Sequence, residues 1–311
     1  ITAKAVYQKL VEEGYIKAKE ASLSTIQRYI RENNLKPKQL ERKQMKSYEM
    51  EFSNDCWQAD TSFGPVIKIN NKKRRTYLIA FIDDASRMLT HTEFYLEDNS
   101  VNMQDSFKKA IAKYGVPRRL FVDNGKAYNN IQIKYIGASL GTAIIYTKPY
   151  SAESEGKIER AFKSIKDGWM NTIDWDNFSS LESLNNKLKK YLEKNYINKL
   201  HSSIGETPRE RFLKDYENLK FIEKSELDYH FLHRSECKVN NVSVIRLKKK
   251  EYEVPQKYIG SRIKVRYLPN DLEKVYIFSE DNKLIDTAYE VKKIDNSKIK
   301  RNSIDFTKME D

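Results

Sequence analysis

The chain has 311 residues, of which 39% are hydrophobic and 12% aromatic, so it can form folded cores and is not a disordered chain. No apolar run approaches 18 residues, which argues against a membrane span, and two cysteines 181 positions apart do not indicate a disulfide scaffold. The net charge is +13, and residues 1–50 and 234–311 each contribute +5 of it. Basic ends around a nearly neutral middle favour a polyanionic partner, although a lysine-rich solvated surface has the same composition.

Residues 1–35 have the pattern of two helices. An apolar stripe ends at Gly14, and a second helix is expected over Thr25–Asn33, with Ile26, Tyr29 and Ile30 facing inward and Ser22 or Ser24 as its cap. The pair resembles the last two helices of a helix-turn-helix unit, whose second helix enters the major groove of DNA. The motif is weak, because any small helical pair shows the same pattern. On this interpretation the DNA-contacting residues are Gln27, Arg28 and Arg31.

Residues 36–52 are polar and basic, and Pro37 lies near their start. We expect this segment to be a linker that lies along DNA phosphates. Its candidate contacts are Lys36, Lys38, Arg42 and Lys43. Because the chain lacks an initiator methionine, we also expect that the helical unit before the linker is truncated upstream.

Residues 53–216 have a mixed pattern of strands and helices, which favours a mixed sheet with helices packed on it. Strands are expected at Trp57–Ile69, Tyr77–Asp83, Met88–Tyr95, Arg119–Val122 and Thr142–Tyr146. Helices are expected at Val101–Tyr114, Glu153–Met170 and Leu181–Asn195.

Residues 236–291 change character after a connector at 217–235, and a polar tail follows at 292–311. Short strands separated by Asn-rich, Asp-rich or Pro-containing turns predict a small antiparallel barrel. They are expected at Lys238–Val244, Glu251–Val254, Arg262–Tyr267, Lys274–Phe278 and Leu284–Ala288.

Three acidic residues stand out by their positions. Asp60 lies within the first strand, Asp123 follows a short apolar strand, and Glu159 lies on a helix. A carboxylate in or at the end of an apolar strand costs burial energy, so it usually has a partner or a chemical role. Three such carboxylates that converge can bind two Mg²⁺ ions, which prefer oxygen ligands.

The helix that carries Glu159 also carries basic residues. Lys163 and Lys166 follow Glu159 at i+4 and i+7, and Arg160 is its neighbour. A carboxylate followed by lysines along one edge suits a metal site beside DNA phosphate. In isolation, the same pattern is more typical of a solvated helix face with an i,i+4 ion pair.

The spacing of the motifs changes that interpretation. Asp123 and Glu159 are separated by 35 residues, in the order W-x-x-D, F-V-D-N-G and P-Y-S-x-x-x-G-K-I-E. This resembles the retroviral-integrase-type DDE transposases, and residues 201–212 resemble the H-S-x-x-G-x-T-P-x-E-x-F end of their core. Residues 252–267 resemble the small barrel of Mu-type transposases. The resemblance implies an α/β multidomain fold with a ribonuclease H-like core, a helix-turn-helix unit before it and a small β-barrel after it.

The resemblance also implies a function. Asp60, Asp123 and Glu159 would be catalytic residues that bind two Mg²⁺ ions, for which Mn²⁺ substitutes. The activity would be cleavage at transposon ends followed by transfer of the 3′-hydroxyl ends into target DNA. Double-stranded transposon-end DNA, target DNA and further copies of the chain in a homo-oligomeric synaptic complex would be the partners, with an accessory ATPase target selector left open. The location would be the nucleoid of a prokaryotic cytoplasm.

Two alternatives remain at this point: a ribonuclease H-like nuclease that does not join strands, and an inactive DNA-binding or assembly protein. Zinc binding by His230, His233 and Cys237 is a weaker interpretation, because a fourth ligand is missing. Asp83 and Asp84 are expected to cap a turn, not to bind a metal.

Overall fold

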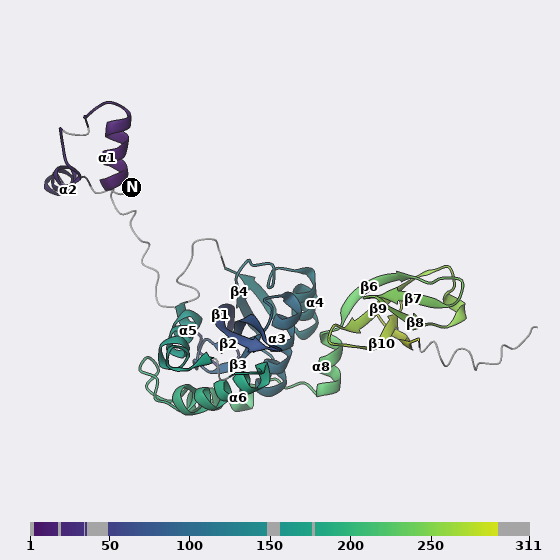
Figure 1. The fold of residues 1–311 in the computed structure, drawn as a ribbon. Helices are drawn as coiled ribbons and strands as arrows, with labels where there is room; N and C mark the ends of the chain where they lie inside the picture. Colours follow the sequence, from purple (N-terminus) through teal and green to yellow (C-terminus); the bar gives the residue numbers. More distant parts are fainter. Residues whose placement is uncertain are drawn as a thin grey trace, which may run out of the picture. The chain divides into compact units, whose positions relative to one another are not determined.

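The computed structural model describes residues 3–17, 20–33, 35, 49–147, 156–175 and 178–291 (Figure 1). The chain divides into two compact units, residues 1–48 and residues 49–311, each of which is considered by itself. Among the described residues, no helix has both the length and the apolar character needed to cross a membrane.

The N-terminal unit contains the two expected helices, α1 (Ala3–Glu12) and α2 (Leu23–Glu32). The cap of α2 is Ser22, whose Oγ accepts a hydrogen bond from the Thr25 amide at 3.2 Å. The expectation that Tyr29 faces inward is wrong, because its side chain is 57% exposed. Two short helices cannot enclose a third large side chain, so only a narrow stripe of α2 is partly covered.

The second unit begins with a five-stranded sheet in the order β3-β2-β1-β4-β5. Three strands are antiparallel neighbours, and the last two run parallel to β1, which confirms the mixed sheet of a ribonuclease H-like core. Their bounds are β1 Trp57–Ile69, β2 Lys72–Asp83, β3 Leu89–Tyr95, β4 Arg119–Val122 and β5 Ala143–Tyr146. β2 begins five residues earlier than expected, because Asn70 and Asn71 both adopt positive φ and form a tight hairpin turn.

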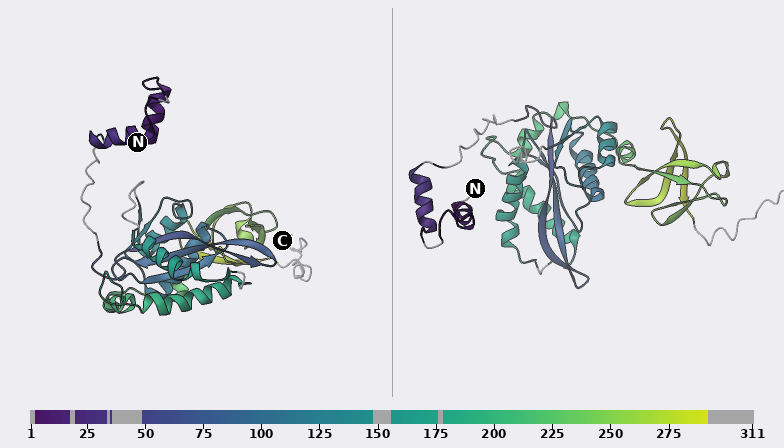
Figure 2. Two further views of the ribbon diagram at one scale, coloured as in Figure 1. Left: turned by 60° about the vertical axis from the view of Figure 1, so that its left-hand side comes forward. Right: turned by 90° about the horizontal axis from the view of Figure 1, so that it is seen from above.

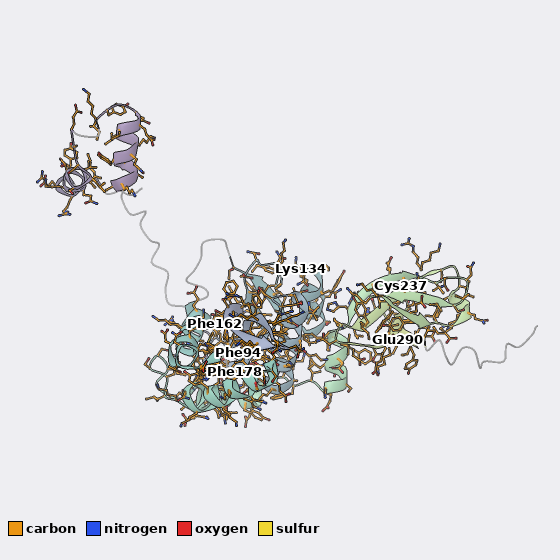
Figure 3. All side chains as sticks on the ribbon, in the orientation of Figure 1. Phe94, Lys134, Phe162, Phe178, Cys237 and Glu290 are labelled. Atoms are coloured by element: carbon orange, nitrogen blue, oxygen red, sulfur yellow. The ribbon has the colours of Figure 1, made fainter. Side chains whose placement is uncertain are left out.

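Helices cover both faces of this sheet (Figure 2). On one face α3 (Ser100–Tyr114) and α4 (Ile131–Leu140) contribute to a core around Phe107. On the other face α5 (Gly156–Gly168) and α6 (Leu181–Leu192) form a second core, which includes Phe94, Phe162 and Phe178 (Figure 3). The sheet therefore lies between two separate apolar cores, one on each face.

Helix α4 was not expected from the sequence, since Gly137 in its middle weakens the helical pattern. The structure gives a reason for this glycine. A Cβ at Gly137 would lie 2.7 Å from both the Thr142 carbonyl oxygen and the Ile144 side chain, so α4 approaches β5 more closely than another residue would allow. The available sequence signal was Asn130, whose side chain accepts from the Ile133 amide and caps the helix.

The helix expected at Leu181–Asn195 begins at the expected residue but ends earlier. α6 covers Leu181–Leu192 and continues as a π-helical turn, Glu193–Ile197. Two further helices were not expected, α7 (Pro208–Leu213) and α8 (Lys224–His230). Both are too short to show a clear helical period in a sequence.

Residues 233–290 form a nearly closed antiparallel barrel in the order β6-β9-β10-β11-β8-β7. Its strands are β6 His233–Lys238, β7 Val244–Leu247, β8 Lys250–Glu253, β9 Arg262–Leu268, β10 Asp271–Phe278 and β11 Leu284–Glu290. The strand expected at Lys238–Val244 is wrong, since that segment is a turn. There the Asn240 side chain accepts hydrogen bonds from the amides of Val242 and Val244, which bends the backbone away from a strand.

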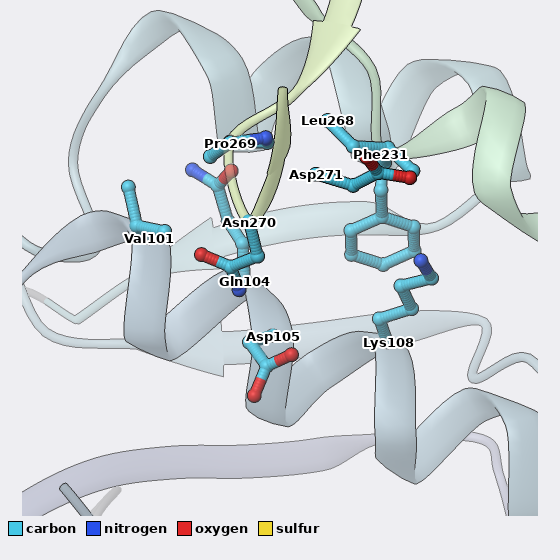
Figure 4. Close-up of a pocket in the computed structure, with 9 residues that line it drawn as sticks. All are labelled: Val101, Gln104, Asp105, Lys108, Phe231, Leu268, Pro269, Asn270 and Asp271. Carbon is cyan, nitrogen blue, oxygen red and sulfur yellow. The ribbon is translucent and has the colours of Figure 1, made fainter. Parts of the chain in front are cut away.

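The barrel contacts the core through residues around α8. His233 Nε2 lies 2.6 Å from Gln104 Oε1, and Phe231 packs edge-on against Phe107. A small cavity of about 150 Å³ lies at this junction, between α3 and the turn that joins β9 to β10 (Figure 4). His230 interacts separately with Ser139, and Cys237 lies in the barrel core, so the zinc interpretation has no geometric support.

Candidate active site

The register of β1 against β4 places two candidate carboxylates side by side. Trp57 pairs with Leu120 and Gln58 with Phe121, and the same offset continued along the strands aligns Asp60 with Asp123. Asp60 is still within β1, whereas Asp123 directly follows the last residue of β4. Both side chains are half-buried. Two carboxylates that are far apart in sequence therefore lie on adjacent parallel strands, where β4 ends beside β1.

Local backbone contacts orient the two carboxylates. Asp60 Oδ1 accepts a hydrogen bond from the Thr61 amide at 2.7 Å, and Asp123 Oδ1 accepts one from the Gly125 amide at 2.9 Å. A Cβ on Gly125 would lie 2.9 Å from Asp123 Oδ1. The glycine of the F-V-D-N-G motif thus allows its backbone to approach the carboxylate closely.

The Tyr128 side chain lies close to Asp60 and Asp123. Its side chain is buried, and its hydroxyl lies 2.7 Å from Thr61 Oγ1. Burial raises the pKa of Tyr128 well above its usual range, and the negative charges of Asp60, Asp98 and Asp123 raise it further. The hydroxyl therefore stays protonated beside three carboxyl groups.

Asp98 is a third acidic group here that sequence reasoning did not select. Burial raises the pKa of Asp98, and Asp123 adds to this effect, while a hydrogen bond with Thr61 partly opposes it. Asp98 belongs to no motif, and its position before α3 gives it the sequence pattern of an ordinary helix start. Only the fold brings it near Asp123.

Glu159 comes from the opposite face of the sheet, in the first turn of α5. Ile158, Phe162 and Ile165 form the buried side of this helix, and Glu159 is exposed at the border of that side, as expected. Within the described ranges, no three His, Cys, Asp or Glu side chains are close enough to hold one metal ion. The structure therefore brings Asp60 and Asp123 together but does not add Glu159 to them.

The turn after β2 fixes the start of α5. Lys157 Nζ lies 2.5 Å from Asp84 Oδ2, which also accepts a hydrogen bond from the Met50 amide. Asp83 accepts hydrogen bonds from the amides of Asn54 and Ser86, so both aspartates cap backbone, as the sequence predicted. Burial, partly opposed by the hydrogen bonds from Ser86 and Asn54, raises the pKa of Asp83 to about 6.

The remaining candidate residues differ in their surroundings. Lys163 is exposed, Lys166 is half-buried, and Arg160 is exposed and donates from Nε to the Gly156 carbonyl oxygen. Gln27, Arg28 and Arg31 are exposed on α2. Lys36, Lys38, Arg42 and Lys43 lie outside the described residues, so the linker prediction gains no structural description.

Comparison with known families agrees with this architecture. Residues 51–152 match the integrase core domain, and residues 228–287 match the C-terminal domain of Mu transposase. The chain carries an integrase core domain followed by a Mu transposase C-terminal domain. Both domains were expected from the sequence, and both are confirmed. The core match contains Asp60 and Asp123 but ends before Glu159.

Two curated relatives are transposases. The chain is 22% identical over 281 residues to the transposase for transposon Tn552 of Staphylococcus aureus, which covers 80% of this chain and 58% of that protein. It is 26% identical over 188 residues to a putative transposase for insertion sequence element IS5376 of Geobacillus stearothermophilus, covering 57% and 45%. The chain thus spans about half the length of the curated relatives it matches.

Solved structures of viral integrases are also similar. The magnesium complex of the HTLV-2 integrase catalytic core domain has 19% identity and a TM-score of 0.41, and the match covers 52% of this chain and 98% of that one. A simian T-cell lymphotropic virus intasome in complex with PP2A regulatory subunit B56 gamma has 16% identity and a TM-score of 0.40, with 91% and 95% covered.

Proposed function

We propose that this chain is a metal-dependent DNA transposase that cleaves transposon ends and transfers their 3′-hydroxyl groups into target DNA. The observation that carries the proposal is the alignment of Asp60, within β1, with Asp123, directly after β4, inside an integrase core domain. The transposase relatives and the Mu-type barrel support the same activity.

The residues fit a divalent metal. Carboxylate oxygens are the ligands that Mg²⁺ prefers, and Asp60 and Asp123 present them from adjacent strands. In our proposal these two residues and Glu159 form the catalytic set and hold two Mg²⁺ ions, with Mn²⁺ as a substitute. The bound metal supplies Lewis-acid stabilisation of the phosphoryl oxygens.

The protein's own part is to align DNA and to place its carboxylates. The Thr61 and Gly125 amides keep Asp60 and Asp123 in fixed orientations, which limits the reorganisation needed when substrate binds. Lys163 and Lys166 follow Glu159 along α5, where they would hold the end of the transposon by its phosphates. The N-terminal unit would be a helix-turn-helix unit that the basic linker joins to the core. Its helix α2 would enter the major groove, where it would contact DNA through Gln27, Arg28 and Arg31.

We also propose that the active form is a homo-oligomer, because two ends must be joined to opposite strands of one target. Such a complex would work on nucleoid DNA, with or without an accessory ATPase. The domain division proposed is residues 1–35, 36–52, 53–216, 217–235, 236–291 and 292–311.

The test is a combined cleavage and joining assay with duplexes that carry the transposon ends, in Mg²⁺, in Mn²⁺ and in EDTA. We expect nicking and joining in either metal and neither in EDTA. Nicking without joining would indicate the nuclease alternative, and DNA binding without either reaction in any metal would indicate an inactive assembly protein.

A further inference from the structure

A second cavity lies beside α5, away from the aligned aspartates. It has a volume of about 410 Å³ and is bounded by α5, the end of α6 with its π-helical turn, the segment 199–202 and Arg87. None of its lining residues is acidic. Its lining includes five residues with basic side chains: Arg87, Lys157, Arg160, Lys199 and His201.

Two of these basic residues are neutralised by carboxylates that lie outside the lining. Arg87 pairs with Glu49 at 2.5 Å, and Lys157 pairs with Asp84. Arg160 and Lys199 form no ion pair with any residue in the described part of the chain, and both are exposed at the rim. The cavity therefore carries an excess positive charge that described side chains do not balance.

The positive charge around the cavity also acts on His201. Burial lowers the pKa of His201, and the nearby charges of Arg87 and Arg160 lower it further. Its Nδ1 lies 3.0 Å from Ser203 Oγ, which fixes the ring within the loop. The imidazole is therefore held close to two guanidinium groups, an arrangement that an anion would stabilise.

Ring stacking and a hydrogen bond hold the wall of the cavity between α5 and α6. Tyr191 stacks on Trp169 with 5.6 Å between ring centroids, and its hydroxyl donates to the Ser164 carbonyl oxygen. Gly168 permits this approach, because a Cβ there would collide with the Tyr191 hydroxyl. Arg160, Ser164 and Gly168 are spaced four residues apart, so one face of α5 lines the cavity, whereas Glu159 and Lys163 form the neighbouring stripe.

We propose that this cavity binds a backbone phosphate of duplex DNA, with Arg160 and Lys199 as its charged contacts. The proposal rests on the proposed function in one respect, namely that DNA is the polyanion. A phosphate bound here would anchor the duplex beside α5, next to the helix stripe that carries Glu159. The bound phosphate would thus fix the position at which the duplex crosses α5. Arginine suits such a site because its planar donors match phosphate oxygens.

The test compares Arg160→Gln/Lys199→Gln with the matched control Lys189→Gln/Lys190→Gln. The control removes the same charge from exposed positions of α6 that do not line the cavity. The full chain is titrated with a fluorescent duplex at several salt concentrations, and thermal melting checks that each variant is folded. We expect the slope of log affinity against log salt to become shallower by about 0.9 for one lost phosphate contact, and only in the cavity variant.

Three results would overturn the cavity assignment alone. The first is a cavity variant with the wild-type slope, while Asp123→Asn still abolishes cleavage, because then the proposed function survives and the cavity assignment fails. The second is a slope that falls equally in the control. The third is that inorganic phosphate raises the melting temperature of the wild type, while the cavity variant keeps the wild-type slope of log affinity for DNA against log salt. The cavity would then be a site for the free anion. A wild-type chain that binds no duplex would contradict both proposals.

Discussion

Lys157 and Asp84 form a buried ion pair that joins the start of α5 to the turn after β2. The Nζ–Oδ2 distance is 2.5 Å, and the two side chains are 13% and 6% exposed. Asp84 also accepts hydrogen bonds from the Met50 amide and from Gln58 Nε2. Glu159 is two residues after Lys157 in the first turn of α5. The ion pair therefore fixes the part of the helix that carries the proposed catalytic glutamate.

Removing one partner of this pair should destabilise the protein. We expect Lys157→Met to lower the free energy of unfolding by about 3–5 kcal/mol, since the Asp84 carboxylate would remain buried without its cation. The double variant Lys157→Met/Asp84→Asn should recover part of that loss. Denaturant unfolding measures both, with Arg118→Met as control, because Arg118 is 75% exposed beside Asp55 and its pair should contribute less than about 1 kcal/mol. A loss no larger than that of the control would contradict the structural role.

Replacing Asp123 should separate chemistry from DNA binding. Asp123→Asn keeps the shape of the side chain but weakens it as a metal ligand, so we expect nicking and joining to fall by at least about a hundredfold while affinity for end DNA changes little. Asp281→Asn, in an exposed barrel turn, is the matched control. Retained cleavage in the Asp123 variant would disprove the metal assignment.

Reversing two charges on α5 should affect DNA and not folding. For Lys163→Glu/Lys166→Glu we expect an almost unchanged melting temperature but much weaker end cleavage and crosslinking to the terminal nucleotides, because helical surface pairs contribute only about 0.3–0.5 kcal/mol. Lys189→Glu/Lys190→Glu on α6 applies the same charge change elsewhere. Cleavage at the wild-type rate at moderate salt would show that this edge of α5 does not face DNA.

Deleting residues 1–48 should remove a large part of the electrostatic contribution to binding. This unit is separate from the rest of the chain, so the remainder should still fold. We expect a shallower dependence of log affinity on log salt, because fewer counterions are released when fewer phosphates are neutralised. An unchanged slope would mean that these residues do not touch phosphate.

His233 should make the junction between core and barrel sensitive to acid. Burial and, to a lesser extent, the charge of Lys248 lower the pKa of His233 to about 4, so the imidazole beside Gln104 is neutral at pH 7. In the unfolded chain the pKa is near 6.5, so the unfolded state binds the proton more readily. The stability contributed by the neutral ring is complete above about pH 6.5 and is lost as the pH falls towards 4, by about 1–3 kcal/mol after solvent screening. Unfolding of His233→Gln should lack this pH dependence, and an equal dependence in both proteins would contradict it.

The sequence by itself determined most strands of the core sheet, the motifs and the order of the integrase core and the Mu-type barrel. Apolar runs such as Arg119–Val122 and Trp57–Ile69 are bounded by clear turn residues, so local patterns define them almost to the residue. The motifs predicted Asp60, Asp123 and Glu159 as one catalytic set, and the structure aligns the first two. The integrase core and the Mu-type barrel were confirmed. These features depend on residues close together in the chain or on fixed spacings.

The tertiary structure decided what depends on distant contacts. Helix α4 was missed because Gly137 lowers its propensity, and the reason for that glycine is a close approach to β5. Asp98, Tyr128 and the Lys157–Asp84 pair had no sequence signal, since their surroundings come from strands and helices far apart in the chain. The basic cavity beside α5 is likewise formed by segments more than 100 residues apart, from Arg87 to His201. Burial and electrostatic fields follow from packing, so only the folded arrangement could reveal them.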